Sequence, residues 1–84
     1  MQIKSRFPRS VLNEIKWKGH RLSKCKIYYI NRGSPGDIAV VEGSKVKDID
    51  KRYLVLEGVP QETCIPYHRI TKIEYDGKII FEHF

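Results

Sequence analysis

Apolar and polar residues along this chain follow two periods, a helical one near the N-terminus and a strand-like one over most of the remainder. Within residues 7–17, four apolar residues recur at helical spacing: Phe7, Val11, Leu12 and Ile15. Polar residues form another stripe: Arg9, Asn13 and Lys16. Pro8 suits the first helical turn and Gly19 suits the helix end. The pattern predicts a helix with a basic outer face, on which Trp17 is expected to anchor the core rather than to stack on a base.

Three later segments are rich in β-branched and aromatic residues and predict strands: residues 24–32, 37–43 and 51–59. In the first of them, one face carries Cys25, Ile27 and Tyr29, and the other carries Lys26, Tyr28 and Ile30. Since apolar groups occur on both faces, we expect this strand to lie in the middle of its sheet.

The segments between these strands differ in character. Residues 32–37, "RGSPGD", contain two glycines and a proline, which predicts a loop. Residues 44–50, "SKVKDID", place Val46 and Ile49 at i, i+3, which predicts a single helical turn.

The last third of the chain contains the clearest local signal. Asp76-Gly77 is typical of a two-residue type I′ hairpin turn, which needs positive φ at both central residues. The expected pairs are Tyr75 with Lys78 and Ile73 with Ile80 on one face, and Glu74 with Ile79 and Lys72 with Phe81 on the other. Both faces mix apolar and polar groups, which favours a curled sheet. The sequence predicts an α+β fold: one N-terminal helix packed on a small antiparallel, curled or barrel-like β-sheet that ends in a β-hairpin.

Length and composition bound this picture further. With 84 residues, the chain (residues 1–84) is expected to be a single domain. Its longest apolar runs are far shorter than the roughly 20 residues that span a bilayer. The first ten residues lack the apolar core of a signal peptide. These features predict a cytoplasmic protein without a membrane partner.

The two cysteines, Cys25 and Cys64, are expected to be buried thiols. A bridge between them is the alternative if the source is a hyperthermophile. The small number of Asn and Gln residues beside 31% charged residues leans weakly toward such a source. Neither cysteine has the spacing of a zinc ligand, so no metal and no cofactor is predicted.

Charge is distributed unevenly along the chain. The net charge is +6, but residues 1–32 carry nine basic side chains against the single acid Glu14, and the remainder is slightly acidic. Segregated basic charge is typical of a polyanion binder, although a solvated basic face is the plainer alternative. The asymmetry favours nucleic acid.

Residues 65–70, "IPYHRI", combine packing anchors with groups that bind anions. Pro66 has no backbone donor, so the stretch is expected at a strand edge or in a turn into the hairpin. A guanidinium offers paired donors that match phosphate oxygens, and the imidazole of His68 beside Arg69 adds another donor. In the alternative, His68 bonds a backbone carbonyl and Arg69 pairs with Glu74 or Glu42.

Other chemistry is less well marked. The loop at residues 32–37, with Arg32, the two glycines Gly33 and Gly36, and Ser34, could expose backbone N–H groups as an anion-binding nest, but it is not a Walker loop and an ordinary connection is favoured. The three histidines (His20, His68 and His83) show no paired arrangement. Nothing in the sequence marks a catalytic site, although a small phosphoesterase remains an alternative.

Four segments together resemble a small, largely archaeal family of RNA cyclic-group end recognition domains. They are "VLNEIKW", "IYYINRG", "PGDIAVVEGSKV" and "IPYHRITKIEYDGKIIF", and they cover nearly the whole chain. The last is the most specific. On this resemblance, His68 and Arg69 carry the family's His-Arg pair, Tyr67 precedes it, and Arg32 ends the first strand. Asn31 departs from the acidic or other polar residue of many relatives.

The resemblance implies an RNA-binding module that recognises RNA ends, including 2′,3′-cyclic phosphate termini. The expected nucleic-acid-binding residues are Lys16, Lys26, Tyr28, Arg32, Tyr67, His68 and Arg69. Base stacking on Tyr28, Tyr29 or Tyr67 would add affinity without sequence preference. The alternative is an accessory domain that docks an RNA-processing enzyme, with its basic face incidental.

Overall fold

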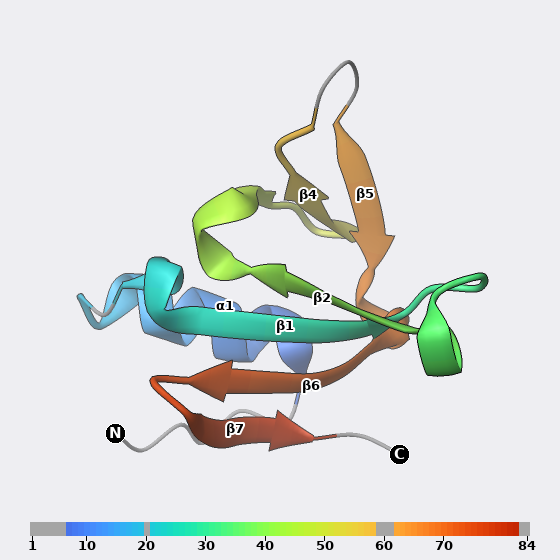
Figure 1. Ribbon diagram of the computed structural model, residues 1–84. Coiled ribbons are helices and arrows are strands. Elements are labelled where there is room, and N and C mark those ends of the chain that lie inside the picture. Colours follow the sequence, from blue (N-terminus) through green and yellow to red (C-terminus); the bar gives the residue numbers. More distant parts are fainter. Residues whose placement is uncertain (1–6, 20, 59–61, 83–84) are drawn as a thin grey trace.

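A computed structural model describes residues 7–19, 21–58 and 62–82 (Figure 1). The elements are α1 (Pro8–Trp17), β1 (Cys25–Ile30), β2 (Ile38–Glu42), β3 (Val46–Ile49), β4 (Tyr53–Leu56), β5 (Thr63–Pro66), β6 (Ile70–Tyr75) and β7 (Lys78–Glu82). Four 3-10 turns connect them: η1 (Leu22–Lys24), η2 (Pro35–Asp37), η3 (Gly43–Lys45) and η4 (Tyr67–Arg69). The predicted α+β class is confirmed. None of the helices formed by the described residues has the length and apolar character needed to cross a membrane.

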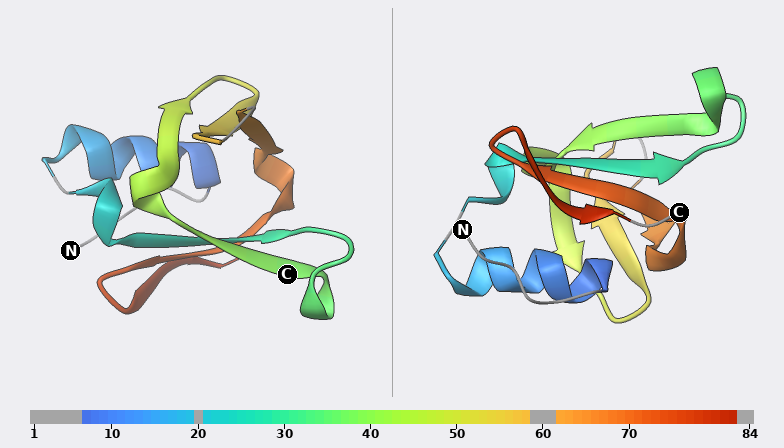
Figure 2. Two further views of the ribbon diagram at one scale, coloured as in Figure 1. Left: turned by 45° about the horizontal axis from the view of Figure 1, so that its top comes forward. Right: turned by 90° about the horizontal axis from the view of Figure 1, so that it is seen from below.

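The strands form two antiparallel sheets rather than a closed barrel. The larger sheet has the order β2-β1-β6-β7 and the smaller has the order β3-β4-β5. As predicted, β1 lies in the middle of its sheet. Figure 2 shows α1 behind the larger sheet, with the smaller sheet closing one side between them. The helix and both sheets therefore surround one core.

Side chains from every layer meet in this core. Its buried members are Val11, Leu12, Ile15, Cys25, Ile27, Leu54, Leu56, Ile65, Ile70, Ile73 and Phe81. Burial raises the pKa of the Cys25 thiol to about 11, so it behaves as a small apolar group. Cys64, expected to be buried, is exposed because it lies on the outer side of the edge strand β5. The two thiols are free and form no disulfide.

Helix α1 follows its predicted stripe with two corrections. Val11, Leu12 and Ile15 are fully buried, and Gly19 has the positive φ of a helix C-terminal residue. Phe7 is 72% exposed because it is the extended N-cap, where helical spacing does not apply. Trp17 is 86% exposed, so the expectation that it anchors the core is wrong. At 100° per residue, Trp17 lies nearly opposite the buried stripe.

Residues 44–50 are mainly a strand rather than the predicted helical turn. A 3-10 turn ends at Lys45, and β3 then pairs with β4. The register shifts between Val46 and Asp48, which places Val46 opposite Leu56 and Ile49 opposite Leu54. Because the bulge adds one residue, Val46 and Ile49 reach the same face at a spacing of three. The i, i+3 pattern therefore came from a bulged strand.

A second bulge changes the C-terminal hairpin. The turn is as predicted, with Asp76 and Gly77 at positive φ and Tyr75 opposite Lys78. The next expected pair, Glu74 with Ile79, is also present. Beyond it the register shifts, so Phe81 lies opposite Ile73 and Glu82 opposite Lys72, and the two expected pairs beyond Glu74 are wrong. The shift turns Phe81 into the core, whereas Ile79, on the turn side of the shift, keeps its expected partner Glu74 and is exposed. His83, at the end of the expected hairpin, and Val59, at the end of the third expected strand, lie outside the described residues.

Candidate nucleic-acid interface

The segment "IPYHRI" is the crossing point between the two sheets. Pro66 ends the edge strand β5, η4 makes a single 3-10 turn, and β6 begins at Ile70. Ile65 and Ile70 on either side of the turn are buried in the core. The turn is therefore fixed at both ends, while His68 and Arg69 remain exposed.

Tyr67 connects η4 to two other parts of the fold. Its hydroxyl donates to the backbone carbonyl of Asp50, and Arg9 Nε in the first turns of α1 donates to the same carbonyl at 3.2 Å. Burial raises the pKa of Tyr67 to about 12, and the nearby Arg9 guanidinium partly opposes that rise. One carbonyl thus holds the helix start, the β3–β4 turn and η4 together.

Removing the Tyr67 hydroxyl should weaken the fold in a pH-dependent way. At pH 8 we expect Tyr67→Phe to lower the free energy of unfolding by about 1 kcal/mol, because the hydrogen bond from the tyrosine hydroxyl to the Asp50 carbonyl is lost. The unfolded tyrosine titrates near its ordinary value of 10.0, below the folded pKa of about 12. Stability from Tyr67 is therefore complete below pH 10 and is lost as the pH rises toward 12.

Urea denaturation of the wild type and Tyr67→Phe at pH 8 and pH 11 measures this effect. At pH 11 the free energy of unfolding of the wild type should exceed that of Tyr67→Phe by less than it does at pH 8. Tyr53→Phe, at a more exposed tyrosine, serves as the control. An identical difference between the wild type and Tyr67→Phe at both pH values would contradict the expected titration.

A groove of about 600 Å³ lies between η4 and the start of α1. Its polar lining includes Arg9, Lys51 and His68, and its aromatic lining includes Phe7, Tyr67 and Phe81. No acidic side chain is among the described residues that line it. We call this the His68 groove; it combines cationic donors with rings against which a sugar or base can pack.

A second groove of about 500 Å³ lies on the outer face of the larger sheet and also reaches His68. Its lining includes Tyr28, Lys72 and Glu82. Lys72 Nζ lies 4.2 Å from the centre of the Tyr28 ring and 3.8 Å from a carboxylate oxygen of Glu74. One face of Tyr28 is thus already occupied by a cation. We call this the Tyr28 groove, and His68 stands where the two grooves meet.

Neither alternative for the His-Arg pair is seen in the structure. Among the residues that the structure describes, the His68 side chain has no hydrogen bond and Arg69 has no ion pair with Glu42 or Glu74. Lys72 takes the place beside Glu74 instead. Arg69 is exposed on η4 but lines neither groove. Of the His-Arg pair, only His68 therefore contributes to the grooves.

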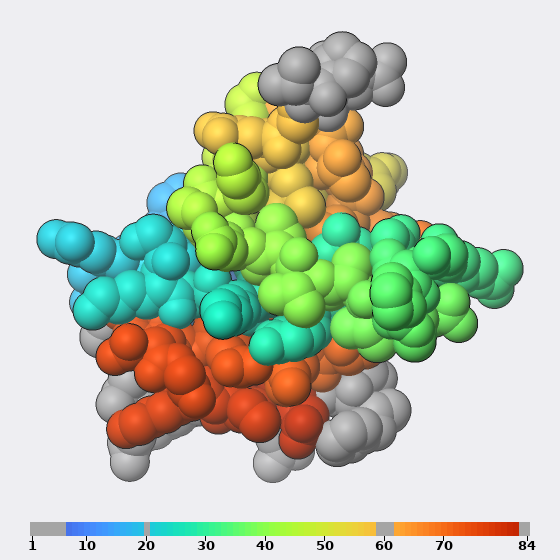
Figure 3. Space-filling model, viewed as in Figure 1, coloured from blue at the N-terminus to red at the C-terminus, as the bar shows by residue number. Residues whose placement is uncertain are grey.

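Arg32 lies on the loop between β1 and β2 and lines neither groove, although β1 ends beside the start of β6, where Tyr29 is opposite Ile70. That loop protrudes at one edge of the molecule (Figure 3). Within it, Ser34 N–H donates to the Asn31 carbonyl at 3.2 Å, and Asp37 N–H donates to the Ser34 carbonyl at 2.8 Å. One of the N–H groups named for an anion-binding nest, that of Ser34, is therefore occupied, and the loop is closed by its own backbone bonds, which favours an ordinary connection.

The remaining predicted residues occupy different surfaces. Lys16 is exposed on α1, whereas Lys26 is exposed on the opposite, outer face of the larger sheet. On that face Lys26 stands between Glu42 and Glu74 of the neighbouring strands, a pairing that opposite charges favour. The basic N-terminal third therefore does not form a single face. Lys4, Arg6 and His20 lie outside the described residues.

Sequence reasoning missed Lys51 and the roles of Phe7 and Arg9 in the His68 groove. Arg9 was placed on the outer face of the helix, and the lysine lies in a turn far from it along the chain. No local pattern brings these residues together, because they come from segments far apart in the sequence. Arg9 and Tyr67 meet only at the backbone carbonyl of Asp50, which precedes Lys51. No group of His, Cys, Asp or Glu side chains in the described ranges is arranged to hold a metal ion.

Comparisons with known proteins bear on the whole chain. A family model described as the MJ1316 RNA cyclic group end recognition domain matches residues 6–83. A UPF0248 protein of Pyrobaculum islandicum is 34% identical over 69 residues, covering 82% of this chain and 79% of that protein. A UPF0248 protein of Pyrobaculum aerophilum is 32% identical over 69 residues, covering 82% and 87%. One of Methanopyrus kandleri is 33% identical over 60 residues, covering 71% and 76%. No solved structure matches this chain.

Proposed function

Because this chain belongs to the MJ1316 RNA cyclic group end recognition domain family, we propose that it binds RNA ends and holds a terminal 2′,3′-cyclic phosphate in the His68 groove. The family name supports RNA end recognition in general. The site and the chemistry of the end are our proposal.

The observation that carries this proposal is the composition of the His68 groove. Three cationic or donor side chains, Arg9, Lys51 and His68, line it beside aromatic rings. A cyclic phosphate carries a single negative charge next to a ribose, so its recognition needs donors on one side and a packing surface on the other. The groove offers both.

Each groove residue has a distinct proposed role. His68 and Lys51 donate to the phosphate oxygens, while Arg9, fixed through Nε by the Asp50 carbonyl, directs its other donors into the groove. Phe7 and Tyr67 pack against the terminal nucleoside. Arg69, next to His68 on η4, contacts the adjoining phosphodiester from outside the groove.

A matched pair of RNA oligonucleotides tests this function. The wild type should bind an oligonucleotide with a 2′,3′-cyclic phosphate about tenfold more tightly than the same sequence with 3′-hydroxyl, as measured by fluorescence anisotropy. Affinity for both should fall about tenfold between 50 and 200 mM salt, because a few neutralised phosphates release counterions. Equal affinity for both ends would remove end recognition and leave RNA binding intact. Ring opening in the same samples would instead indicate a phosphoesterase.

Docking to an RNA-processing enzyme is the second candidate. It is favoured by exposed apolar residues on the outer face of the larger sheet, which faces the viewer in Figure 3: Ile30, Ile38, Val40 and Ile79. A salt-insensitive complex with such an enzyme, together with no RNA binding at 50 mM salt, would replace the first proposal with this one.

A further inference from the structure

We propose that the RNA strand leaves the His68 groove along the outer side of α1 and stacks one of its bases on Trp17. This inference rests on the proposed RNA-end binding and extends it from one nucleotide to a short single-stranded segment. It gives the exposed tryptophan a ligand, an unpaired base, and gives the bound strand a direction across the surface.

The grooves themselves supply the path. A third groove, of about 500 Å³, runs along α1 and is lined by Arg9, Ser10, Asn13, Trp17 and Lys18, together with Glu14. Arg9 and Ser10 also line the His68 groove. The two hollows therefore adjoin at the start of the helix, and the third one extends along α1 to Trp17 and Lys18.

Helix geometry sets the length of this path. Arg9, Asn13 and Trp17 follow one another at intervals of four residues, so they form one ridge on the helix surface. At a rise of about 1.5 Å per residue, Trp17 lies about 12 Å along the axis from Arg9. Because stacked nucleotides are spaced about 3.4 Å apart, three to four nucleotides would cover this length. The base on Trp17 would then be a few nucleotides upstream of the end.

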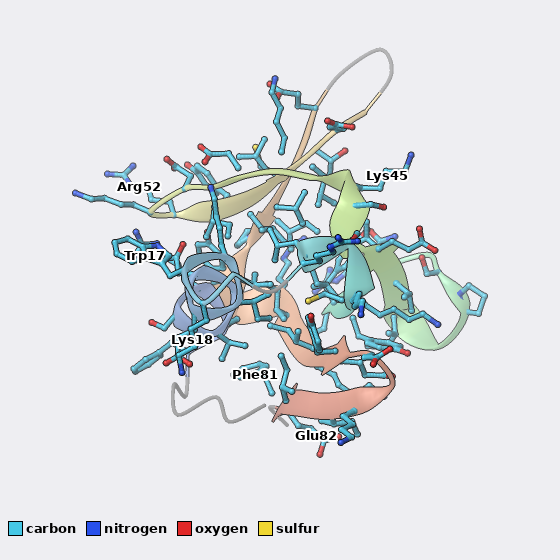
Figure 4. The ribbon with its side chains drawn as sticks, turned by 90° about the vertical axis from the view of Figure 1, so that its left-hand side faces the viewer. Trp17, Lys18, Lys45, Arg52, Phe81 and Glu82 are labelled. Atoms are coloured by element: carbon cyan, nitrogen blue, oxygen red, sulfur yellow. The ribbon has the colours of Figure 1, made fainter. Side chains whose placement is uncertain are left out.

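Trp17 has the environment of a stacking platform. Trp17 is the single tryptophan of the chain, and its side chain is 86% exposed. Figure 4 shows the ring pointing outward from α1, at the same edge of the molecule from which Arg52 projects. Lys16, beside it on the helix, is exposed as well. An exposed ring among cations matches a strand of bases and phosphates.

The one acid in this groove is offset by a local pairing. Glu14 forms an i, i+4 ion pair with Lys18 at 3.6 Å. The pairing leaves the groove basic in balance, because Arg9 has no acidic partner in it. Charge complementarity therefore favours an anionic ligand over a neutral or basic one, and the exposed Trp17 ring favours an anion that carries bases.

The single tryptophan makes the inference directly measurable. Two probes are used: uridine 2′,3′-cyclic monophosphate and an eight-nucleotide oligouridylate with the same end. The oligonucleotide should quench Trp17 fluorescence, whereas the mononucleotide should bind by calorimetry and leave the emission unchanged. Trp17→Ala should weaken oligonucleotide binding about 5- to 100-fold, the range for losing one stacked base, and should leave mononucleotide binding unchanged.

Controls separate this inference from the function on which it rests. Ile79→Ala removes an exposed apolar side chain from the opposite sheet face and should change neither affinity. If Trp17→Ala binds the oligonucleotide as the wild type does, the path along α1 is wrong and end binding survives. If neither probe binds the wild type, both proposals fail. Unchanged thermal unfolding of Trp17→Ala would show that lost affinity is not lost structure.

Discussion

Gly43→Ala should bring this domain close to unfolding, with a loss of about 3 kcal/mol or more in the free energy of unfolding. A Cβ atom at this position would lie 1.7 Å from the Leu22 carbonyl oxygen and 2.7 Å from its carbon. It would also lie 3.0 Å from Cβ of the buried Cys25. The first two contacts are backbone atoms, so no side-chain rotation relieves them. Domains of this size have roughly 4–13 kcal/mol of stability in total.

The location of Gly43 makes the effect global. It begins η3, which joins the larger sheet to the smaller one, and it packs against η1 immediately before β1. Separating η3 from η1 would displace strands of both sheets. Urea denaturation followed by circular dichroism measures the change, with Ser44→Ala, at an exposed residue of the same turn, as the control. A Gly43→Ala midpoint equal to that of Ser44→Ala would show that the backbone moves apart without cost.

The local signals in this sequence predicted its helix and strands well wherever the regular spacing is not interrupted by a bulge. Val11, Leu12 and Ile15 located the helix, and Asp76-Gly77 located the hairpin. The error in element type at residues 44–50 and the error in hairpin register share a physical cause, which is an extra residue in a strand. In β3 a bulge gave a strand the spacing of a helix, and in β7 a bulge moved Phe81 inward. Bulges depend on the pairing partner, which the local pattern does not contain.

The candidate site was only partly within reach of the sequence. The position of His68 between two packing anchors could be read from "IPYHRI", because Ile65 and Ile70 fix both ends of η4. Trp17 was also within reach, since its angle on the helix opposes the buried stripe. Its chemistry as a large apolar residue outweighed that angle. The groove was not predictable, because Arg9 and Lys51 meet His68 only through tertiary contacts.

His68→Ala should abolish most of the preference for cyclic-phosphate ends. One charge-assisted hydrogen bond is worth about 1.5–3 kcal/mol, which is roughly a 10- to 100-fold change in affinity. We expect that loss for the cyclic-phosphate oligonucleotide and little change for the 3′-hydroxyl oligonucleotide, because only the former fills the His68 groove. Lys51→Ala should likewise lower the affinity for the cyclic-phosphate oligonucleotide. Since both side chains are exposed, neither substitution should alter thermal unfolding.

Two further variants locate the phosphate by contrast. Lys16→Ala, outside the His68 groove, should weaken binding of both oligonucleotides equally and reduce the salt dependence by about one phosphate contact. Arg69→Ala should reduce the end preference less than His68→Ala, because Arg69 lines neither the His68 groove nor the Tyr28 groove. The decisive comparison is between His68→Ala and Arg69→Ala, because the two residues are neighbours on η4. If Arg69→Ala abolishes the preference and His68→Ala retains it, the terminal phosphate lies on the outer side of η4, and the groove holds another part of the RNA.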